Sequence, residues 1–316
     1  MPTVNKLLIA LCSAIFISGC VTESFHDSST AEFADPVELT EVPFYPQSRY
    51  QCGPAALASV LNYSGLNVDK EQLTGDIYLP DRKGSLQVEM IAAIRRYGRV
   101  PYVYHGNLQS ILVQIQEKRP SLVLLNLGLK TLPVYHYAVV VGYQSNSDEI
   151  ILRSGTDPRR LMQRNKFLSS WNRAGSWALV VLPAGVLPDA IDVESYLEAV
   201  VALDAGGQCL LAETGYLAVL QRQPENLLAR FGLANSLRMQ GKLDAAVIEY
   251  EKLLNLDRGY KPGLNNLADT YLQLGRCQEA AGLLQHADIV EHSKNTVDQA
   301  LLETRIEIES ACNTSR

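Results

Sequence analysis

The sequence predicts an α+β domain followed by an all-α helical repeat, and two observations support this division. Residues 39–184 begin with stretches of helical periodicity and end with several strand-like runs. From about residue 193, similar residues recur every 34 positions. A chain of 316 residues is long enough for about two domains.

Helices dominate the first half of residues 39–184. The stretch "PAALASVLNYSG" carries apolar residues at helical spacing, with Pro54 at the predicted first helical position and Gly65 as a C-terminal cap. A second helix, "LQVEMIAAIRRYG", ends at Gly98, and a third, "NLQSILVQIQEK", has Asn107 as its N-cap. The first helix therefore begins close to Cys52.

Strands dominate the second half of the same domain. The strand-like runs are "VPYVYHG", "SLVLLNLG", "HYAVVVGYQ", "EIILRSG" and "SWALVVLP". Helices first and a mostly antiparallel sheet later predict an α+β domain with a single core. Residues 185–192 then form a linker to the repeats.

The repeat occupies residues 193–312. Glycines recur at Gly207, Gly241 and Gly275, and alanines at Ala212, Ala246 and Ala280. This pattern resembles the tetratricopeptide repeat, in which each unit is a pair of antiparallel helices with small residues at the crossing. The resemblance implies three repeats and a capping helix, which bind a protein partner or substrate on their concave face.

The first 38 residues have the features of an export signal and a tether. Lys6 precedes a short apolar stretch, too short to span a bilayer as a helix, that ends in "ISGC". This resembles the lipobox of bacterial lipoproteins, which implies that residues 1–19 are removed and Cys20 is lipidated. Val21 then implies the inner leaflet of the outer membrane, facing the periplasm. The alternative is an ordinary secretory signal; residues 20–38 are predicted to be a flexible tether.

Six cysteines are present. Cys12 leaves with the signal and Cys20 is lipidated, while an exported domain meets conditions in which disulfides form. Cys277 starts the second helix of the last repeat and Cys312 ends the capping helix, so an antiparallel arrangement predicts a Cys277–Cys312 disulfide. Cys209 holds the position of Cys277 two repeats earlier, which is too distant for pairing.

Charge and ligand spacing exclude several classes of function. The formal charge is −6 and no Lys/Arg-rich run is present, which argues against nucleic-acid binding. An anionic membrane surface would not attract the chain electrostatically either. No C-x-x-C or H-x-x-x-H spacing indicates a metal site, and no cofactor is expected.

Cys52 is a candidate nucleophile. At a helix N-terminus, the free amides and the positive dipole end favour a thiolate, and Gly53 leaves room for a substrate carbonyl. The alternative is a small cysteine that fills the core.

A base for this thiol is predicted from the hairpin that follows. His136 opens the run "HYAVVVGYQ", and a hairpin centred on residues 146–147 pairs residues whose numbers sum to 293. His136 then lies opposite Asp157, whose carboxylate would orient the imidazole. A shift of one or two residues would bring Ser154 or Thr156 there instead.

Three further polar residues are candidates for supporting roles in the site. Gln47 and the amide of Cys52 could stabilise an oxyanion, with Gln51 as the alternative side chain. Asp148 competes with Asp157 as the acid, but it lies in the turn of the hairpin, at the wrong end. His136 could also be a half-buried strand residue whose ring is satisfied by the backbone.

The segments "VPFYPQSRYQCGPAALASVLNYSG", "HYAVVVGY" and "DP" resemble the bacteriocin-processing cysteine peptidases, family thirty-nine of that class. The resemblance covers residues 40–184 and implies a papain-like fold. It also implies Cys52 as nucleophile, His136 as base, Asp157 as orienting acid and Gln47 in the oxyanion site. The best-known members are fused to an exporter. This sequence carries no Walker motif, so ATP binding is not expected.

The sequence therefore favours a lipid-anchored thiol peptidase whose repeats recruit a protein. Two other hypotheses remain open. One is a non-catalytic binding or assembly lipoprotein that acts through its repeats. The other is a different thiol acyl transfer, such as amide ligation or deamidation, on the same residues.

Overall fold

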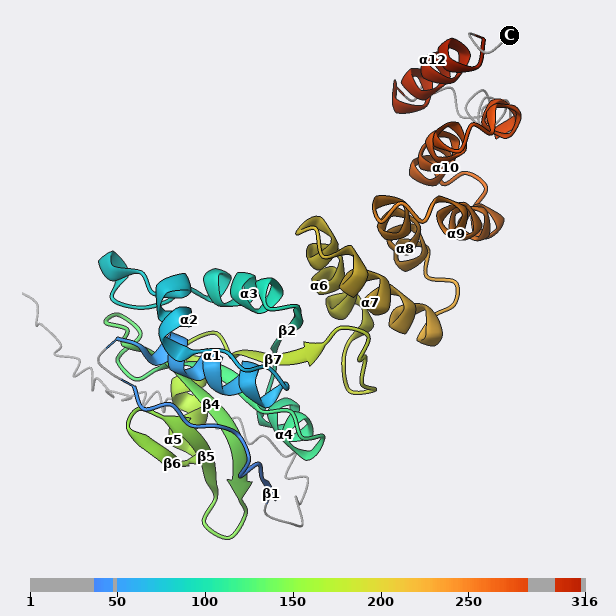
Figure 1. Ribbon diagram of the computed structural model, residues 1–316. Coiled ribbons are helices and arrows are strands. Elements are labelled where there is room, and N and C mark those ends of the chain that lie inside the picture. Colours follow the sequence, from blue (N-terminus) through green and yellow to red (C-terminus); the bar gives the residue numbers. More distant parts are fainter. Residues whose placement is uncertain (1–36, 48–49, 284–298, 314–316) are drawn as a thin grey trace, which may run out of the picture. The chain divides into compact units, whose positions relative to one another are not determined.

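The computed structural model describes residues 37–47, 50–283 and 299–313 (Figure 1). Residues 37–183 form the predicted α+β domain. Its elements are β1 (Val37–Glu38), α1 (Cys52–Tyr63), α2 (Lys70–Ile77), the short 3-10 helix η1 (Pro80–Arg82), α3 (Gln87–Arg96), β2 (Arg99–His105), α4 (Leu108–Gln116), β3 (Ser121–Asn126), β4 (Tyr135–Gln144), β5 (Glu149–Ser154), β6 (Asp157–Gln163), α5 (Arg164–Asn172) and β7 (Trp177–Pro183).

The strands form one antiparallel sheet in the order β2-β7-β3-β4-β5-β6, with β1 paired to β4. Helix α1 packs along β4, the strand near the centre of the sheet. All six residues of β3 and six consecutive residues of β4 are buried. The central strands and α1 therefore form the core that holds the predicted site.

Helix α1 is buried along most of its length because its side chains are small. Nine of its twelve residues are buried, among them Ala55, Ala56 and Ala58. The helix begins at Cys52, with Gln51 as N-cap, so Pro54 is the third helical residue and the prediction of Pro54 as the first was wrong. A proline fits there because amides of the first turn have no intrahelical acceptor.

Five elements were not predicted from the sequence: β1, α2, η1, α5 and β6. Strand β1 occupies the last two residues of the predicted tether, so the tether ends earlier than predicted. Strand β6 forms the edge of the sheet, and only one of its seven residues is buried. Its sequence "DPRRLMQ" lacks apolar alternation, as is common in edge strands, where charges and proline hinder further pairing.

The second part of the chain is built from helix pairs. The pairs are α6 (Val193–Ala205) with α7 (Cys209–Arg222), α8 (Leu227–Met239) with α9 (Leu243–Leu256), and α10 (Lys261–Gln273) with helical residues 277–283; α12 (Gln299–Asn313) follows. The recurrent Gly207, Gly241 and Gly275 all adopt positive φ, between 70° and 80°, at the turn inside each pair. The repeat alanines 212, 246 and 280 are fully buried. The predicted fold class, an α+β peptidase-like domain followed by tetratricopeptide repeats, is confirmed.

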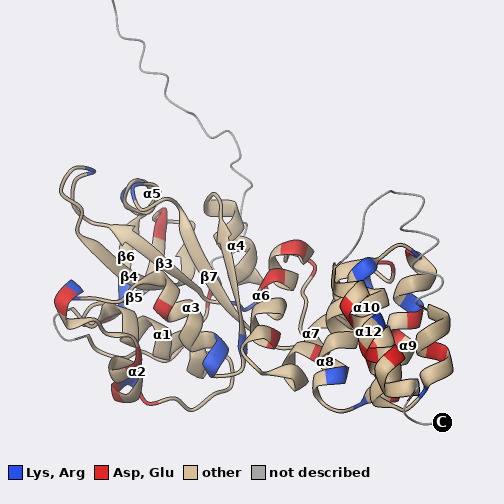
Figure 2. Ribbon diagram, turned by 90° about the horizontal axis from the view of Figure 1, so that it is seen from above, with Lys and Arg blue, Asp and Glu red and all other residues tan. Residues whose placement is uncertain are grey.

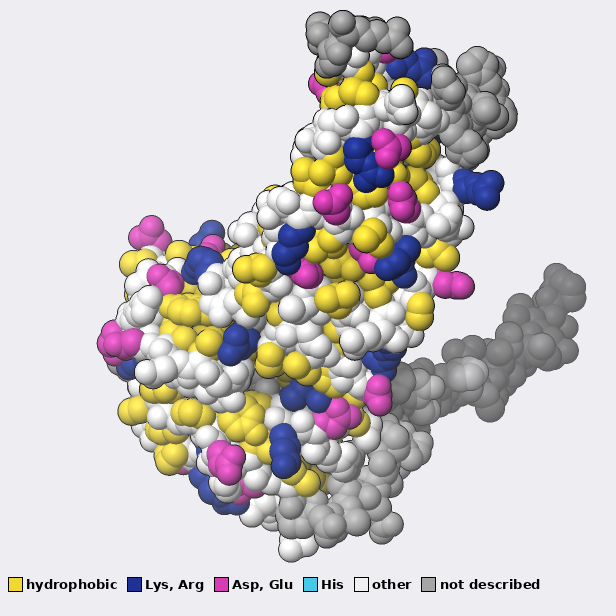
Figure 3. Space-filling view, turned by 45° about the vertical axis from the view of Figure 1, so that its right-hand side comes forward, with side chains coloured by type: hydrophobic (Ala, Val, Ile, Leu, Met, Phe, Trp, Pro, Cys, Tyr) yellow, Lys and Arg dark blue, Asp and Glu magenta, His cyan; other side chains and the backbone are white. Residues whose placement is uncertain are grey.

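Charges of both signs cover the repeats. Acidic and basic residues intermingle on α9, α10 and α12 (Figure 2). Exposed hydrophobic side chains lie between them on the face shown in Figure 3.

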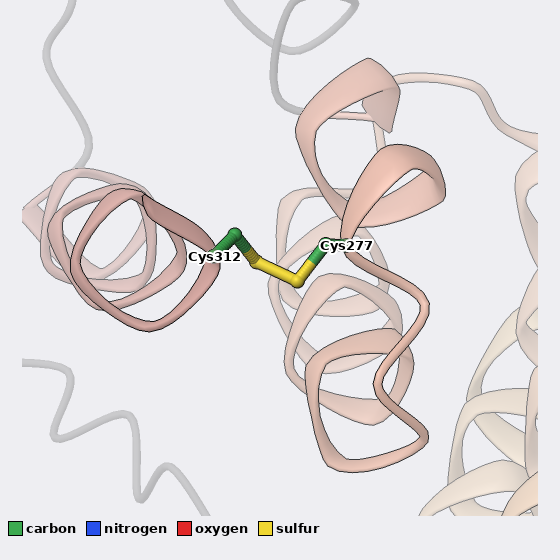
Figure 4. The surroundings of a disulfide bond; sticks show 2 residues. All are labelled: Cys277 and Cys312. Atoms are coloured by element: carbon green, nitrogen blue, oxygen red, sulfur yellow. A yellow bond between two sulfur atoms is a disulfide. The ribbon is translucent and has the colours of Figure 1, made fainter. Parts of the chain in front are cut away.

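Cys277 and Cys312 are joined by a disulfide in the structure, with their Cα atoms 5.8 Å apart (Figure 4). The bond links the start of helical residues 277–283 to the end of α12. A hydrogen bond of 2.6 Å from Thr304 Oγ1 to Asn265 Oδ1 also ties α12 to α10. Cys209 is a free thiol.

Candidate functional site

Cys52 lies at the start of α1, half-buried against the sheet. Its thiol lies within hydrogen-bonding reach of the backbone of Tyr137, the β4 residue that follows His136. The fold therefore brings the predicted nucleophile to the strand that carries the predicted base.

Packing also favours glycine at position 53, and the prediction that Gly53 leaves room for a substrate stays a prediction. A Cβ atom at Gly53 would lie 2.5 Å from Ser85 Oγ and 2.7 Å from Ser85 Cβ. Ser85 is held beside α1 by the Tyr137 hydroxyl, which donates to the Ser85 carbonyl at 3.3 Å. Nothing in the sequence places Ser85 beside Gly53, because the two meet only through the tertiary fold.

The protonation of Cys52 also differs from the sequence-based expectation. Burial raises the pKa of the Cys52 thiol above its ordinary value of 9.0. Hydrogen bonds from the backbone at Tyr137, Gly53 and Cys52 itself lower this pKa, but by less than burial raises it. The resting group at neutral pH is therefore a thiol, and the expected thiolate requires proton transfer to a base.

His136 lies near the start of β4, opposite Leu125 of β3. Its Nε2 is 2.8 Å from Ser154 Oγ, so this hydrogen bond fixes the ring and leaves Nδ1 available. Burial, and secondarily the positive charge of Arg160, lower the pKa of His136 from 6.5 to about 4. The imidazole is therefore neutral at pH 7 and can accept a proton.

The predicted register of the β4–β5 hairpin is correct only near the turn. Gln144 pairs with Glu149 and Gly142 with Ile151, as predicted, but a bulge follows and Val140 then pairs with Leu152. The strands stay paired only as far as Val139 and Arg153. The prediction that His136 lies opposite Asp157 was therefore wrong.

Asp157 pairs instead with Ser154 across β5 and β6. It is exposed, and its Oδ1 accepts a hydrogen bond of 2.9 Å from the Arg159 amide. Ser154, one of the two alternatives considered for a shifted register, is the residue bonded to His136. Whether Asp157 assists through Ser154 stays a prediction.

Gln47 and Asp148, the other two polar candidates, make contacts outside the pair of Cys52 and His136. The Gln47 amide donates to the Gly155 carbonyl at 3.1 Å, which holds the segment before Cys52 next to Ser154. An oxyanion role for the Gln47 side chain stays a prediction. Asp148 accepts from the Tyr143 hydroxyl at 2.7 Å and pairs with Arg164, so it stabilises the turn region as a structural residue.

Neutral His136 predicts a pH-dependent stability. The folded-state pKa lies below the unfolded value, so the stabilisation is complete above pH 6.5 and is lost as the pH falls towards 4. Its maximum loss is about 3 kcal/mol. Urea unfolding at pH 7 and pH 4.5, followed by Trp171 and Trp177 fluorescence, should show a smaller acid loss in His136→Gln than in the wild type. Equal losses in both proteins would contradict the prediction.

The sequence also raises the questions of lipidation, metal binding and membrane spans. Cys20 lies outside the described residues. Within the described parts of the chain, no cluster of three or more His, Cys, Asp or Glu residues could bind a metal ion. No helix in those same parts combines the length and hydropathy needed to cross a bilayer.

A family model matches most of the α+β domain. Residues 39–179 match the model of the family described as "Peptidase_C39 like family". None of the curated proteins matches the chain.

Solved structures resemble each part of the chain separately. A protein described as a C39-like peptidase from Bacillus anthracis shares 18% identity over 47% of this chain and 98% of its own, with a TM-score of 0.40. The peptidase domain of Streptococcus ComA, a bi-functional ABC transporter, shares 21% identity over 45% of this chain and 98% of its own, with a TM-score of 0.37. The tetratricopeptide domain of Arabidopsis OM64 shares 17% identity over 37% of this chain and 94% of its own, with a TM-score of 0.34. The match of the family model covers residues 39–179 and no part of the repeats.

Proposed function

We propose that this chain is a cysteine peptidase held at a membrane through lipid on Cys20. The proposed peptidase activity rests on one observation. The Cys52 thiol lies beside the backbone next to His136, and Ser154 holds the neutral ring of His136. A thiol nucleophile, a base and an orienting group are the parts that acyl transfer needs.

The proposed reaction begins with Cys52 as a thiol and His136 as a neutral imidazole. His136 Nδ1 takes the Cys52 proton as sulfur attacks the peptide carbonyl carbon, and the amide of Cys52 and Gln47 stabilise the oxyanion. The imidazolium then protonates the leaving amine, and an acyl-enzyme forms. Water, deprotonated by His136, releases the acid and restores the thiol. The hydrogen bond to Ser154 Oγ occupies Nε2 and leaves Nδ1 for these proton transfers.

Thiol labelling tests whether Cys52 rests as a thiol. Because burial raises the pKa of Cys52, the rate of alkylation by iodoacetamide should rise about tenfold per pH unit between pH 7 and 9. Peptide mapping by mass spectrometry distinguishes Cys52 from Cys209. A rate that is already at its plateau at pH 7 would indicate a preformed thiolate–imidazolium pair. No labelling at any pH would favour the non-catalytic binding protein.

Matched variants separate the two candidate orienting groups. Ser154→Ala removes the hydroxyl bonded to His136 and is expected to lower kcat/KM by about 10- to 100-fold. Ser154→Thr keeps a hydroxyl and should retain more activity than Ser154→Ala. Asp157→Asn should change kcat/KM less than about threefold, because the exposed carboxylate bonds a backbone amide. The reverse order would assign the orienting role to Asp157.

The repeats are proposed to hold a protein partner or substrate. A cleft of about 420 Å³ is lined by residues of α6, α7, α8 and α10, including Phe231, Asn235 and Met239. Met239 and Leu228, both in this cleft, expose half or more of their surface. Apolar side chains beside amide groups suit a peptide segment. A lipid on Cys20 would hold both the peptidase domain and the repeats at the same membrane surface of the cell envelope.

A further inference from the structure

The chain between β3 and β4 extends the sheet as a hydrogen-bonded finger, residues 127–134. The Leu127 amide donates to the Val134 carbonyl at 2.8 Å, and the Leu129 amide to the Leu132 carbonyl at 3.1 Å. The buried side chain of Asn126 fixes the base of the finger. Its Oδ1 accepts from the Gly128 and Val134 amides, both at 3.0 Å, and its Nδ2 donates to the Leu129 carbonyl at 3.2 Å.

The finger carries four exposed apolar residues. Its two hydrogen bonds bring Leu127 next to Val134 and Leu129 next to Leu132, so the four residues lie close together. Their exposed fractions rise towards the tip, from 43% at Leu127 to 66% at Leu129, and from 58% at Val134 to 71% at Leu132. Because hydrogen bonds fix the hairpin, its leucines stay exposed. A contiguous exposed apolar patch of this kind indicates an interaction surface.

We propose that this finger docks on a lipid bilayer. At the tip, Lys130 has an aliphatic stem long enough to reach lipid headgroups from an apolar patch. At the base, Tyr135 is 57% exposed, and tyrosine favours the boundary between water and hydrocarbon. With a formal charge of −6, the chain would bind through apolar burial, without the help of anionic lipid.

The tether is long enough for this contact. Strand β1 joins β4 at Tyr143, 11 residues from Leu132, which is roughly 36 Å along the strand and finger. Cys20 lies 17 residues before Val37, and such a segment spans up to about 58 Å when extended. A lipid on Cys20 and the finger can therefore contact one bilayer.

Docking would also orient the proposed peptidase. His136 is the second residue of β4 and follows Val134 of the finger by two positions. Docking would therefore bring the end of the sheet that carries His136 close to the membrane surface. If the proposed peptidase activity holds, the substrates are polypeptide segments at that surface.

Tryptophan quenching by lipid tests the docking. The chain has two tryptophans, Trp171 and Trp177, and both are buried. Leu132→Trp therefore adds a single exposed reporter at the finger. Val186→Trp is the matched control, because residue 186 is 45% exposed and follows β7 at the end of the sheet away from the finger. The full chain is reconstituted with phosphatidylcholine vesicles whose acyl chains carry bromine.

The emission of Leu132→Trp should fall by up to about a third, the share of one tryptophan in three, and shift to shorter wavelength, while wild type and Val186→Trp stay unchanged. Adding Leu129→Ser and Val134→Ser to Leu132→Trp should weaken the quenching. The proposal is overturned if the Leu132→Trp protein is not quenched or is quenched no more than the Val186→Trp protein. It is also overturned if, without quenching, the serine substitutions change the sedimentation of the chain, which indicates self-association. A raised KM for a soluble peptide, again without quenching, indicates a substrate contact and overturns it too. The fluorescence needs no peptidase activity, so it is informative even if the proposed function fails.

Discussion

Cys52→Ala is expected to abolish peptide hydrolysis, with kcat/KM reduced about 10⁴-fold or more. The reaction that the site supports passes through a thioester on this sulfur, and alanine offers no nucleophile. His136 does not replace it in this proposal, because its ring is bonded to Ser154 and serves as the base. Activity is measured by mass spectrometry of cleaved peptides from a mixed library.

The chain offers a matched control for this substitution. Cys209 is the second free thiol of the described residues, and it lies in the repeats at the start of α7. Cys209→Ala should leave hydrolysis unchanged. Trp171 and Trp177 fluorescence should be the same in wild type and Cys52→Ala, because the change removes one sulfur from a half-buried position. Full activity in a folded Cys52→Ala protein would exclude the proposed peptidase.

Removing the Cys277–Cys312 disulfide is expected to destabilise the end of the repeats by about 3 to 4 kcal/mol. The bond closes a loop of 35 residues, and closure restricts the unfolded chain. Repeats contact mainly their neighbours, so the loss should be confined to α10, residues 277–283 and α12. The α+β domain should unfold as before.

Two spectroscopic signals report separately on the unfolding of the repeats and of the α+β domain. Circular dichroism at 222 nm follows the helices, and tryptophan fluorescence follows the α+β domain, which holds both Trp171 and Trp177. Cys277→Ser/Cys312→Ser should shift only the first signal to lower urea concentration, and a reductant should have the same effect on the wild type. Cys209→Ser serves as the control. Identical unfolding curves with and without reductant would show that the bond adds no stability.

Much of the fold could be predicted from local patterns. The 34-residue spacing identified the helix pairs, because a turn glycine and buried alanines recur in each unit. Five strands of the α+β domain followed from short apolar runs. Strand β6 could not be predicted in this way, since its exposed charged residues lack the alternation of a half-buried strand.

Part of the candidate site could likewise be predicted from the sequence, and part depends on the tertiary structure. Cys52 before a small-residue helix and His136 at the start of an apolar strand are visible in the sequence, because each depends on one element. The partner of His136 depends on two paired strands. A bulge between Val140 and Gly142 shifts the register by one residue. The pairing ends at Val139 and Arg153 and the chain turns into β6 after Ser154, so Ser154 rather than Asp157 bonds to the ring.

The sequence by itself therefore determined most of the elements, the repeat, and the candidate thiol and imidazole. The tertiary structure alone decided their chemical state, since burial raises the pKa of Cys52 and lowers that of His136. It also decided that Gly53 makes room for Ser85. The physical reason is common to these cases. Periodicity and propensity act over one or two turns of chain, whereas desolvation, close packing and strand register are set by residues far apart in sequence.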